Sequence, residues 1–226
     1  MKTVDPSPAG SPLLVFDSVG FTYPGRDAPI LKDLSFVVPA GGFVSVEGPS
    51  GGGKSTLLRL ACRLEVPDSG QVLLDGRPAA AMAPEALRRE VCCVQQTPTL
   101  LPASVRANLL LPFGFRVNAD RRPPDDALLR RRLDDFHLDA VELHHGAQTL
   151  SVGQKQRLCV LRAMLLSPRM LLLDEPTAAL DRDNARRVRD VIERLNRDEG
   201  VTVMMVSHNA EDARAATVRI RIGGGG

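Results

Sequence analysis

The chain has 226 residues, of which 43% are hydrophobic and 25% are charged, a composition typical of one folded globular domain and not of a disordered chain. A net charge of +2, with arginines interleaved among acids as in "RRPPDDALLRRRLDD", excludes the basic stripe of a nucleic-acid binder. No apolar run approaches the roughly 20 residues that cross a bilayer, and the N-terminus lacks the apolar stretch of a secretory signal. We therefore expect a single domain over residues 1–226, a disordered lead over residues 1–12 and no nucleic-acid partner.

The N-terminal part of the chain predicts an antiparallel layer followed by a phosphate loop. Short β-rich runs over residues 13–43 are separated by turns, a pattern typical of antiparallel strands. "FVSVEG" predicts a strand that ends in a glycine-rich loop, and "KSTLLRLACRL" after it has helical spacing. The order strand, loop and helix is the context in which such a loop binds phosphate.

The middle of the chain changes in character. A strand over "GQVLLDG", a helix over "PEALRRE" and a strand over "VCCVQ" are expected first. Residues 97–149 then contain prolines at positions 98, 102, 112, 123 and 124 and an amphipathic run, "DDALLRRRLDDFHL". We interpret this stretch as a helical subdomain.

The C-terminal part alternates helices with apolar strands. A helix over "KQRLCVLRAMLL" precedes a strand over "RMLLLD", and a helix over "NARRVRDVIERLNR" precedes a strand over "VTVMMVS". Apolar strands that alternate with helices indicate a parallel sheet covered on both faces, so the predicted fold class is α/β with a mostly parallel sheet. "VRIRIGGGG" predicts an edge strand followed by a flexible glycine tail.

The four cysteines, Cys62, Cys92, Cys93 and Cys159, have no metal-binding spacing. In a strand, the adjacent Cys92 and Cys93 point to opposite faces of the sheet. We predict reduced thiols in a reducing compartment, with neither a disulfide nor a metal site.

Residues 48–55, "GPSGGGKS", match the phosphate-loop pattern G-x-x-x-x-G-K-[ST]. Glycines allow the backbone N–H groups to surround a phosphate, and the start of the following helix contributes its positive dipole end. Lys54 can reach the β- and γ-phosphates, and the Ser55 hydroxyl can bind Mg²⁺. A plain glycine-rich turn before a helix is the alternative, which this context disfavours. The expected ATP-binding residues of the loop are Gly48, Pro49, Ser50, Gly51, Gly52, Gly53, Lys54, Ser55 and Thr56.

Two acids follow the apolar run in "MLLLDE" and complete the chemistry that a phosphate loop requires. Asp174 ends a predicted buried strand, where it can hold the water shell of the metal ion. Glu175 lies one residue further on, where it can face the γ-phosphate, and is the candidate general base for an attacking water. Either acid alone would be an ordinary carboxylate at the end of a strand. Together with the loop they indicate nucleotide hydrolysis.

These motifs, in this order, resemble the ATP-binding cassette (ABC) family, whose ATPase subunits power ABC transporters. The resemblance covers the chain from about Leu13 to Ile222. It implies a P-loop NTPase core over residues 13–96 and 155–222, which includes the antiparallel layer, and a helical subdomain over residues 97–154. It also implies ATP and Mg²⁺ as cofactors and ATP hydrolysis as the activity.

Four further residues resemble family motifs. Tyr23 in "FTYP" resembles the aromatic on which adenine stacks, although a strand aromatic in the core would read the same way. Gln96 resembles the Q-loop glutamine, which contacts the metal and the lytic water and faces the transmembrane partner. Asp181 resembles the D-loop residue that crosses the dimer interface, and His208 resembles the switch histidine that hydrogen-bonds the γ-phosphate. The expected catalytic residues are Glu175, His208, Gln96 and Lys54, and the expected metal ligands are Ser55, Gln96 and Asp174.

"LSVGQ" resembles the family signature, usually Leu-Ser-Gly-Gly-Gln, which binds the ATP held by the phosphate loop of the other subunit. Ser151, Gly153 and Gln154 match it, so the resemblance implies a dimer. Without the family, the stretch is a polar helix start with Ser151 as the N-cap. Val152 departs from the usual glycine: it costs little at the start of a helix, where φ is negative, but damages the site if a left-handed backbone is required. We favour the helix start.

The resemblance implies an ATPase subunit that forms a homodimer around two Mg-ATP. It would drive a separate integral-membrane permease from the cytoplasmic, inner face of the membrane. The stretch "QQTPTLLPASVRANLLLPFGFR" resembles the ATPases of bacterial iron or metal exporters more than those of importers. Two alternatives stay open. One is a soluble ABC ATPase that is not linked to transport, and the other is a nucleotide-sensing module without hydrolysis, which only Val152 supports.

Overall fold

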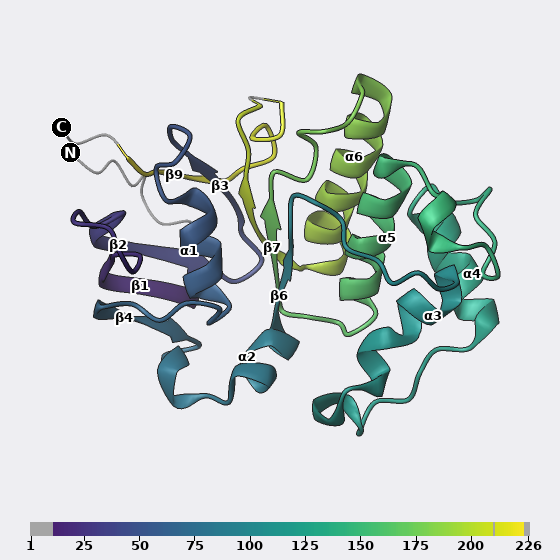
Figure 1. The fold of residues 1–226 in the computed structure, drawn as a ribbon, viewed down its shortest axis with the longest axis horizontal. Helices are drawn as coiled ribbons and strands as arrows, with labels where there is room; N and C mark the ends of the chain where they lie inside the picture. The colour runs from purple at the N-terminus through teal and green to yellow at the C-terminus, as the bar shows by residue number, and fades with distance from the viewer. Residues whose placement is uncertain (1–10, 210, 224–226) are drawn as a thin grey trace.

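A computed structural model of the chain describes residues 11–209 and 211–223. Residues 1–10 of the expected lead and the last glycines of the tail, 224–226, lie outside the described residues. Pro12, which the predicted lead included, belongs to the first strand. Two β-sheets lie side by side, with one helix between them and the other long helices beyond the second sheet (Figure 1).

The first sheet is antiparallel, as the turn-separated runs predict. Leu14 and Phe16 of β1 are buried, and the Phe16 ring stacks on Phe36 at a centroid distance of 4.5 Å. In spatial order the strands are β2 (Leu31–Pro39), β1 (Pro12–Phe21), β4 (Ser69–Leu74) and β5 (Arg77–Pro78).

The second sheet is parallel throughout, which confirms the predicted class. Successive residues of its strands face two separate cores: Met170 and Leu172 pack in one, whereas Leu171 and Leu173 pack in the other. The strands are therefore apolar on both faces, the pattern that the sequence shows. In spatial order they are β6 (Val91–Val94), β7 (Met170–Asp174), β8 (Thr202–Val206), β3 (Phe43–Glu47) and β9 (Val218–Arg221). β9 is at the edge, as predicted.

Helices cover both faces of the parallel sheet. α1 (Lys54–Ala61) packs between the two sheets, and α5 (Val152–Met164) and α6 (Arg182–Glu199) cover the opposite face (Figure 1). The other α-helices are α2 (Pro84–Glu90), α3 (Val105–Leu110) and α4 (Asp126–Asp135). Short 3₁₀ turns span Ala79–Ala81, Leu111–Gly114, Arg116–Asn118 and Ala147–Thr149. In the described part of the chain, no helix has the length and apolar character to cross a membrane.

The stretch over residues 97–149 contains only short helices. Ser104 and Asp125 accept backbone N–H bonds as the N-caps of α3 and α4, which explains where these helices begin. Leu129 and Leu133 of α4 are fully buried in the same core as α5. This stretch therefore packs on α5 and adds no core of its own.

Candidate functional site

The loop of residues 48–53 joins β3 to α1 and has the backbone that only glycine supports easily. Gly53 adopts φ 94° as the N-cap of α1, and a Cβ there would lie 2.8 Å from Leu31 Cδ2. Gly48 has φ 154°, and a Cβ there would lie 2.2 Å from the carbonyl oxygen of Ile222. The loop is thus fixed by close packing on β2 and on Ile222, the residue after β9, with its N–H groups at the start of a helix.

Lys54 folds back over this loop. Its Nζ donates to the carbonyl oxygens of Gly48 at 3.0 Å and Pro49 at 2.9 Å, and the residue is only 5% exposed. The N–H of Gly52 donates to the Pro49 oxygen at 3.1 Å and closes the turn. A positive charge held inside a ring of backbone at a helix N-terminus fits an anion such as phosphate.

Ser55 and Asp174 form an oxygen pair that joins α1 to the end of β7. The Ser55 hydroxyl donates to Asp174 Oδ1 at 3.1 Å, and burial raises the pKa of Asp174 above its ordinary value in spite of this bond. Among the described residues no cluster of three or more His, Cys, Asp or Glu side chains could hold a metal ion. A hydroxyl and a carboxylate fit Mg²⁺, which takes most of its other ligands from water and phosphate.

Glu175 lies between two donors from neighbouring strands. Gln96 Nε2, after β6, donates to Glu175 Oε2 at 3.2 Å, and His208 Nε2, after β8, lies 3.1 Å from Glu175 Oε1. Glu175 itself adopts a left-handed φ of 46°, and its N–H donates to the Val206 carbonyl at 3.0 Å. A left-handed glutamate is uncommon, and such strain concentrates at functional sites. The sequence pointed to each of these three side chains separately, and the fold brings them into contact.

Tyr23 reaches the loop from the antiparallel sheet. Its hydroxyl is 3.1 Å from Thr56 Oγ1, and its ring meets Phe21 edge-on at 4.9 Å and 87°. The residue is half-buried against the first core. The structure therefore places Tyr23 beside the residues expected to bind nucleotide, with its hydroxyl oriented by Thr56.

The signature stretch forms the start of α5. Ser151 Oγ accepts the N–H of Gln154 at 3.2 Å, and Gln154 Oε1 accepts the N–H of Ser151 at 2.9 Å, which is a capping box. This box starts α5 at Val152, as the N-cap interpretation of Ser151 predicts and ahead of the start at Lys155 that helical spacing suggests. Val152 is a helical residue, is not among those with positive φ and is 49% exposed. The helix-start interpretation of Val152 is confirmed.

Gly153 packs on Asn184 of α6, a contact that the sequence did not reveal. A Cβ on Gly153 would lie 2.9 Å from Asn184 Cγ and Oδ1. Asn184 Oδ1 accepts from Arg157 Nη1 at 3.2 Å, and Asn184 Nδ2 donates to Asp181 Oδ2 at 2.7 Å. Asp181 also caps α6 through the Asn184 N–H at 2.9 Å. One asparagine therefore ties the start of α5 to the start of α6.

The two phosphate-binding candidates belong to different sides of the sheet. α1 and the phosphate loop pack in the first core, whereas α5 and α6 pack in the second. Within residues 11–209 and 211–223, no hydrogen bond joins Ser151, Gly153 or Gln154 to the loop of residues 48–56. The signature of this chain does not complete the phosphate loop of the same chain.

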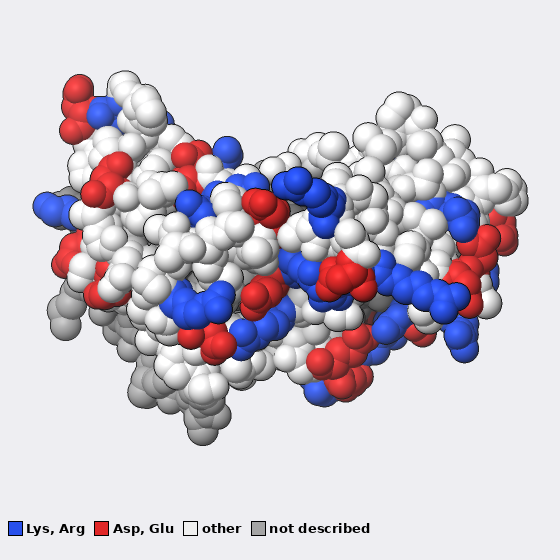
Figure 2. All heavy atoms as spheres, turned by 90° about the horizontal axis from the view of Figure 1, so that it is seen from below, with Lys and Arg blue, Asp and Glu red and all other residues white. Residues whose placement is uncertain are grey.

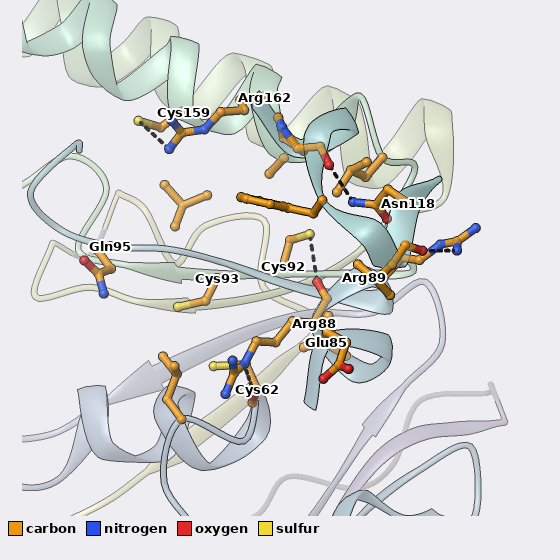
Figure 3. Close-up of a pocket in the computed structure, with 18 of the residues that line it drawn as sticks. Cys62, Glu85, Arg88, Arg89, Cys92, Cys93, Gln95, Asn118, Cys159 and Arg162 are labelled. Carbon is orange, nitrogen blue, oxygen red and sulfur yellow. Dashed lines mark hydrogen bonds between the residues drawn. The ribbon is translucent and has the colours of Figure 1, made fainter. Parts of the chain in front are cut away.

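A groove of about 810 Å³ opens between α2, β6, α5 and the turn after α3, and the sequence analysis did not anticipate it (Figure 3). Its apolar lining includes Leu64 and Phe115, which are 42% and 54% exposed. Its charged lining residues are Arg88, Arg89, Arg116, Arg162 and Glu85. Basic side chains interleaved with acids form a band across the underside of the molecule (Figure 2). The groove thus combines apolar side chains with four arginines and one glutamate, and one of the arginines, Arg89, is paired with Asp120.

All four cysteines line this groove. Cys92 and Cys93 pack against different cores, which confirms that they point to opposite faces of β6. Burial raises the pKa of Cys92 to about 12 and also raises the pKa of Cys159. These thiols are therefore almost wholly protonated at neutral pH and react slowly with electrophiles.

Comparisons with known proteins agree with one another. The family model described as ABC transporter matches residues 31–178. The "Probable iron export ATP-binding protein FetA" of Escherichia coli (strain K12) is 38% identical over 206 residues, which cover 91% of this chain and 89% of that protein. An "ATP-dependent lipid A-core flippase" of Xanthomonas axonopodis pv. citri (strain 306) is 38% identical over 201 residues, but these cover only 33% of the flippase. A solved dimer, "a post-hydrolysis state of the ATP-binding cassette MJ0796 bound to ADP and Pi", superposes with a TM-score of 0.79 at 29% identity over 93% of this chain and 94% of that one.

The packing of Gly153 on Asn184 can be tested with a double-mutant cycle. Gly153→Ala should lower the free energy of unfolding by about 1–3 kcal/mol, because the new methyl overlaps the amide. In an Asn184→Ala background the same change should be neutral or stabilising, because alanine is favoured over glycine in a helix by roughly 1 kcal/mol. Urea unfolding measures all four proteins. An equal fall in the free energy of unfolding in both backgrounds would show that the Asn184 side chain is not what the new methyl group overlaps.

Proposed function

The chain belongs to the ABC transporter family, and from this membership we propose that it dimerises head to tail around two Mg-ATP and drives a separate membrane permease. ATP binding and hydrolysis are properties of the family, and a related cassette was captured with ADP and Pi. The observation that carries the proposal is the contact of Glu175 with Gln96 and His208 beside an intact phosphate loop. The same contact argues against a module that senses nucleotide without hydrolysis.

Glu175 is the proposed base for hydrolysis. The water oxygen forms a bond to the γ-phosphorus, the bond from that phosphorus to the β–γ bridging oxygen breaks, and the water proton moves to the Glu175 carboxylate. Gln96 and His208 each bind one oxygen of this carboxylate and so fix its direction. Lys54 would exchange its hydrogen bonds to the carbonyl oxygens of Gly48 and Pro49 for bonds to the phosphates, to which it supplies positive charge. Ser55, Asp174 and Gln96 would hold Mg²⁺, which neutralises charge on the phosphate oxygens.

A second copy of the chain is proposed to complete each ATP site. The start of α5 carries exposed polar atoms and the positive end of a helix, and it lies across the sheet from the loop of its own chain. Ser151 and Gly153 of one copy would therefore meet the γ-phosphate on the loop of the other. Asn184 holds Asp181 against this surface, so the signature and the D-loop would reach the partner as one unit.

The groove is the proposed docking site of the permease. A groove lined by apolar side chains, among them Phe115 and Leu64, and by four arginines and one glutamate fits a short amphipathic segment with an acidic residue. Docking there would place the chain on the inner face of the membrane. β6 lines the groove and leads directly to Gln96, so a segment in the groove lies close to a residue that contacts the base.

Iron is the proposed cargo of the transporter. The support is a relative named as a probable iron export ATP-binding protein, which aligns over nearly its whole length with this chain. The flippases share only a third of their length with it, so their cargo is a weaker guide.

Replacing the base tests the hydrolysis step. Glu175→Gln should lower the turnover of Mg-ATP by roughly 10²- to 10⁴-fold, because the amide cannot accept the water proton. Binding of a fluorescent ATP analogue should be unchanged. The matched Lys54→Ala variant should instead lose nucleotide affinity. Full turnover by Glu175→Gln would remove Glu175 from the role of base.

A cysteine reporter tests the docking site. Burial raises the pKa of Cys92 and Cys159, and Cys62, whose pKa is lowered by its hydrogen bond with Cys93, is only 1% exposed. With a pKa of about 12 in place of 9.0, Cys92 has on the order of 10³-fold less thiolate at pH 8 than an ordinary cysteine. Phe115→Cys should react quickly with a maleimide in the free chain and slowly when inside-out vesicles containing the permease are added. Leu128→Cys on α4, where the native residue is 37% exposed, is the control and should react equally in both conditions. Unchanged labelling of Phe115→Cys would place the permease elsewhere.

Proteoliposomes test the cargo. The chain and its permease should move iron across the membrane when Mg-ATP is supplied, as an iron-sensitive fluorophore in the lumen reports. The Glu175→Gln variant should abolish the signal, because closure would no longer be followed by hydrolysis. Lipid movement without iron movement in the same vesicles would assign the chain to a flippase.

A further inference from the structure

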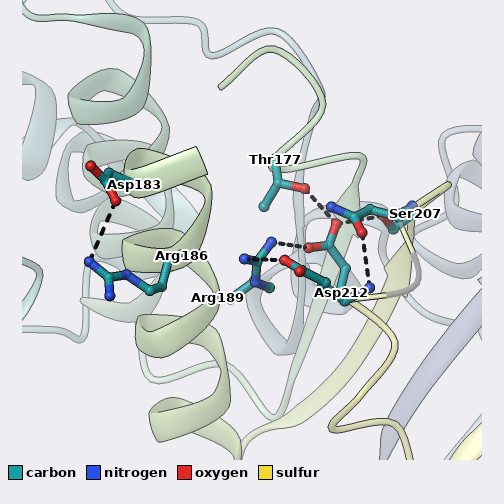
Figure 4. Close-up of polar contacts among 8 residues, drawn as sticks. Thr177, Asp183, Arg186, Arg189, Ser207 and Asp212 are labelled. Carbon is teal, nitrogen blue, oxygen red and sulfur yellow. Dashed lines mark hydrogen bonds and ion pairs between the residues drawn. The ribbon is translucent and has the colours of Figure 1, made fainter. Parts of the chain in front are cut away.

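A fully buried carboxylate lies behind the proposed catalytic groups. Asp212 follows His208 by four residues, and its side chain has 0% exposure. Thr177 Oγ1 and Ser207 Oγ both donate to Asp212 Oδ2, and Arg189 Nη1 of α6 donates to Oδ1 at 3.0 Å (Figure 4). Arg189 Nη2 also binds Glu211 Oε2 at 2.9 Å. The buried charge is thus matched by a guanidinium and two hydroxyls.

The two hydroxyls come from the two loops that carry the catalytic groups. Thr177 lies two residues after Glu175, and Ser207 lies one residue before His208. One hydroxyl from each loop therefore donates to the same oxygen of Asp212.

Ser207 also fixes the turn that contains the histidine. Its hydroxyl hydrogen is committed to Asp212, so its lone pair accepts the N–H of Asn209 at 3.0 Å. His208 is the residue between Ser207 and Asn209, and its Nε2 reaches Glu175 Oε1 at 3.1 Å. A change at Asp212 would release both ends of this contact.

A second ion pair on α6 differs from the Arg189–Asp212 pair in its exposure to water. Arg186 and Asp183 are 3.6 Å apart, but their side chains are 66% and 80% exposed (Figure 4). Exposed ion pairs of this kind contribute little to the stability of a folded protein. Arg189 and Asp212 are instead almost inaccessible to water, so the loss of one partner leaves a buried polar group unmatched.

We propose that Asp212 is a positioning residue for ATP hydrolysis, because it binds the loops of Glu175 and His208 to one another and to α6. The Asp212 side chain is 0% exposed and acts through the loops that carry Glu175 and His208. This inference rests on the proposed catalytic roles of Glu175 and His208. It extends them to a residue outside the family motifs in this sequence.

The direct test is Asp212→Asn, which keeps the shape but replaces one acceptor by a donor. The kcat for Mg-ATP should fall about 10- to 100-fold, as expected for a misplaced catalytic group, while KM stays near the wild-type value. In a His208→Ala background, Asp212→Asn should lower kcat by a smaller factor than in the wild-type chain, because the contact of His208 with Glu175 is already lost. Asp198→Asn breaks an exposed pair with Arg197 at the far end of α6 and should leave kcat unchanged.

The outcomes are separable. Wild-type kcat for Asp212→Asn, or an equal further loss in the His208→Ala background, would overturn the positioning role alone. Full turnover by His208→Ala would instead overturn the catalytic assignment on which the inference rests. If Asp212→Asn does not fold, Ser207→Ala removes one hydroxyl from the same oxygen. It should lower kcat several-fold with unchanged KM, and wild-type kcat there would also overturn the proposal.

Discussion

The parallel direction of the second sheet determines where every proposed catalytic group lies. Because β6, β7, β8 and β3 are neighbours and run the same way, the segments that follow them leave at one edge. Gln96, Glu175 and His208 follow β6, β7 and β8. The phosphate loop follows β3, and the Ser55–Asp174 bond connects that loop to β7. The site is therefore a consequence of the order of strands, and its side chains meet although they are far apart in sequence.

Two sets of hydrogen bonds, one around Asp212 and one around Asn184, hold the loops at this edge of the parallel sheet in place. Asp212 holds the loops of Glu175 and His208 from the side of α6, and Asn184 holds the starts of α5 and α6 together. Both sets reach α6, the helix that begins at the D-loop residue Asp181. A partner that binds the surface at Asp181 would thus contact the start of α6, the same helix whose Arg189 binds Asp212. The groove reaches the same edge through β6 and Gln95, the residue before Gln96.

The motifs that are continuous in the sequence could be predicted well. The glycine-rich loop, the Ser151 cap and the apolar strands depend on local chemistry. The order strand, loop and helix around residues 48–56 and the two sides of β6 therefore agree with the sequence prediction. The contacts of Asn184, Asp212 and the groove could not be predicted from this sequence alone. Each depends on which helix packs on which strand, and a single sequence does not specify such residue pairs. Helical spacing alone places the start of α5 too late, at Lys155, whereas the N-cap interpretation of Ser151 places it at Val152, where the structure has it.

The central claim is that one chain supplies only half of each ATP site, and the mass of the ATP-bound particle tests it most directly. Light scattering of the Glu175→Gln variant with saturating Mg-ATP should give twice the 24.4 kDa of one chain, with two ATP bound per particle. Replacing Ser151 by arginine in that variant should return the mass to 24.4 kDa with ATP still bound. A particle of 24.4 kDa that binds and turns over ATP without a second copy would contradict the account.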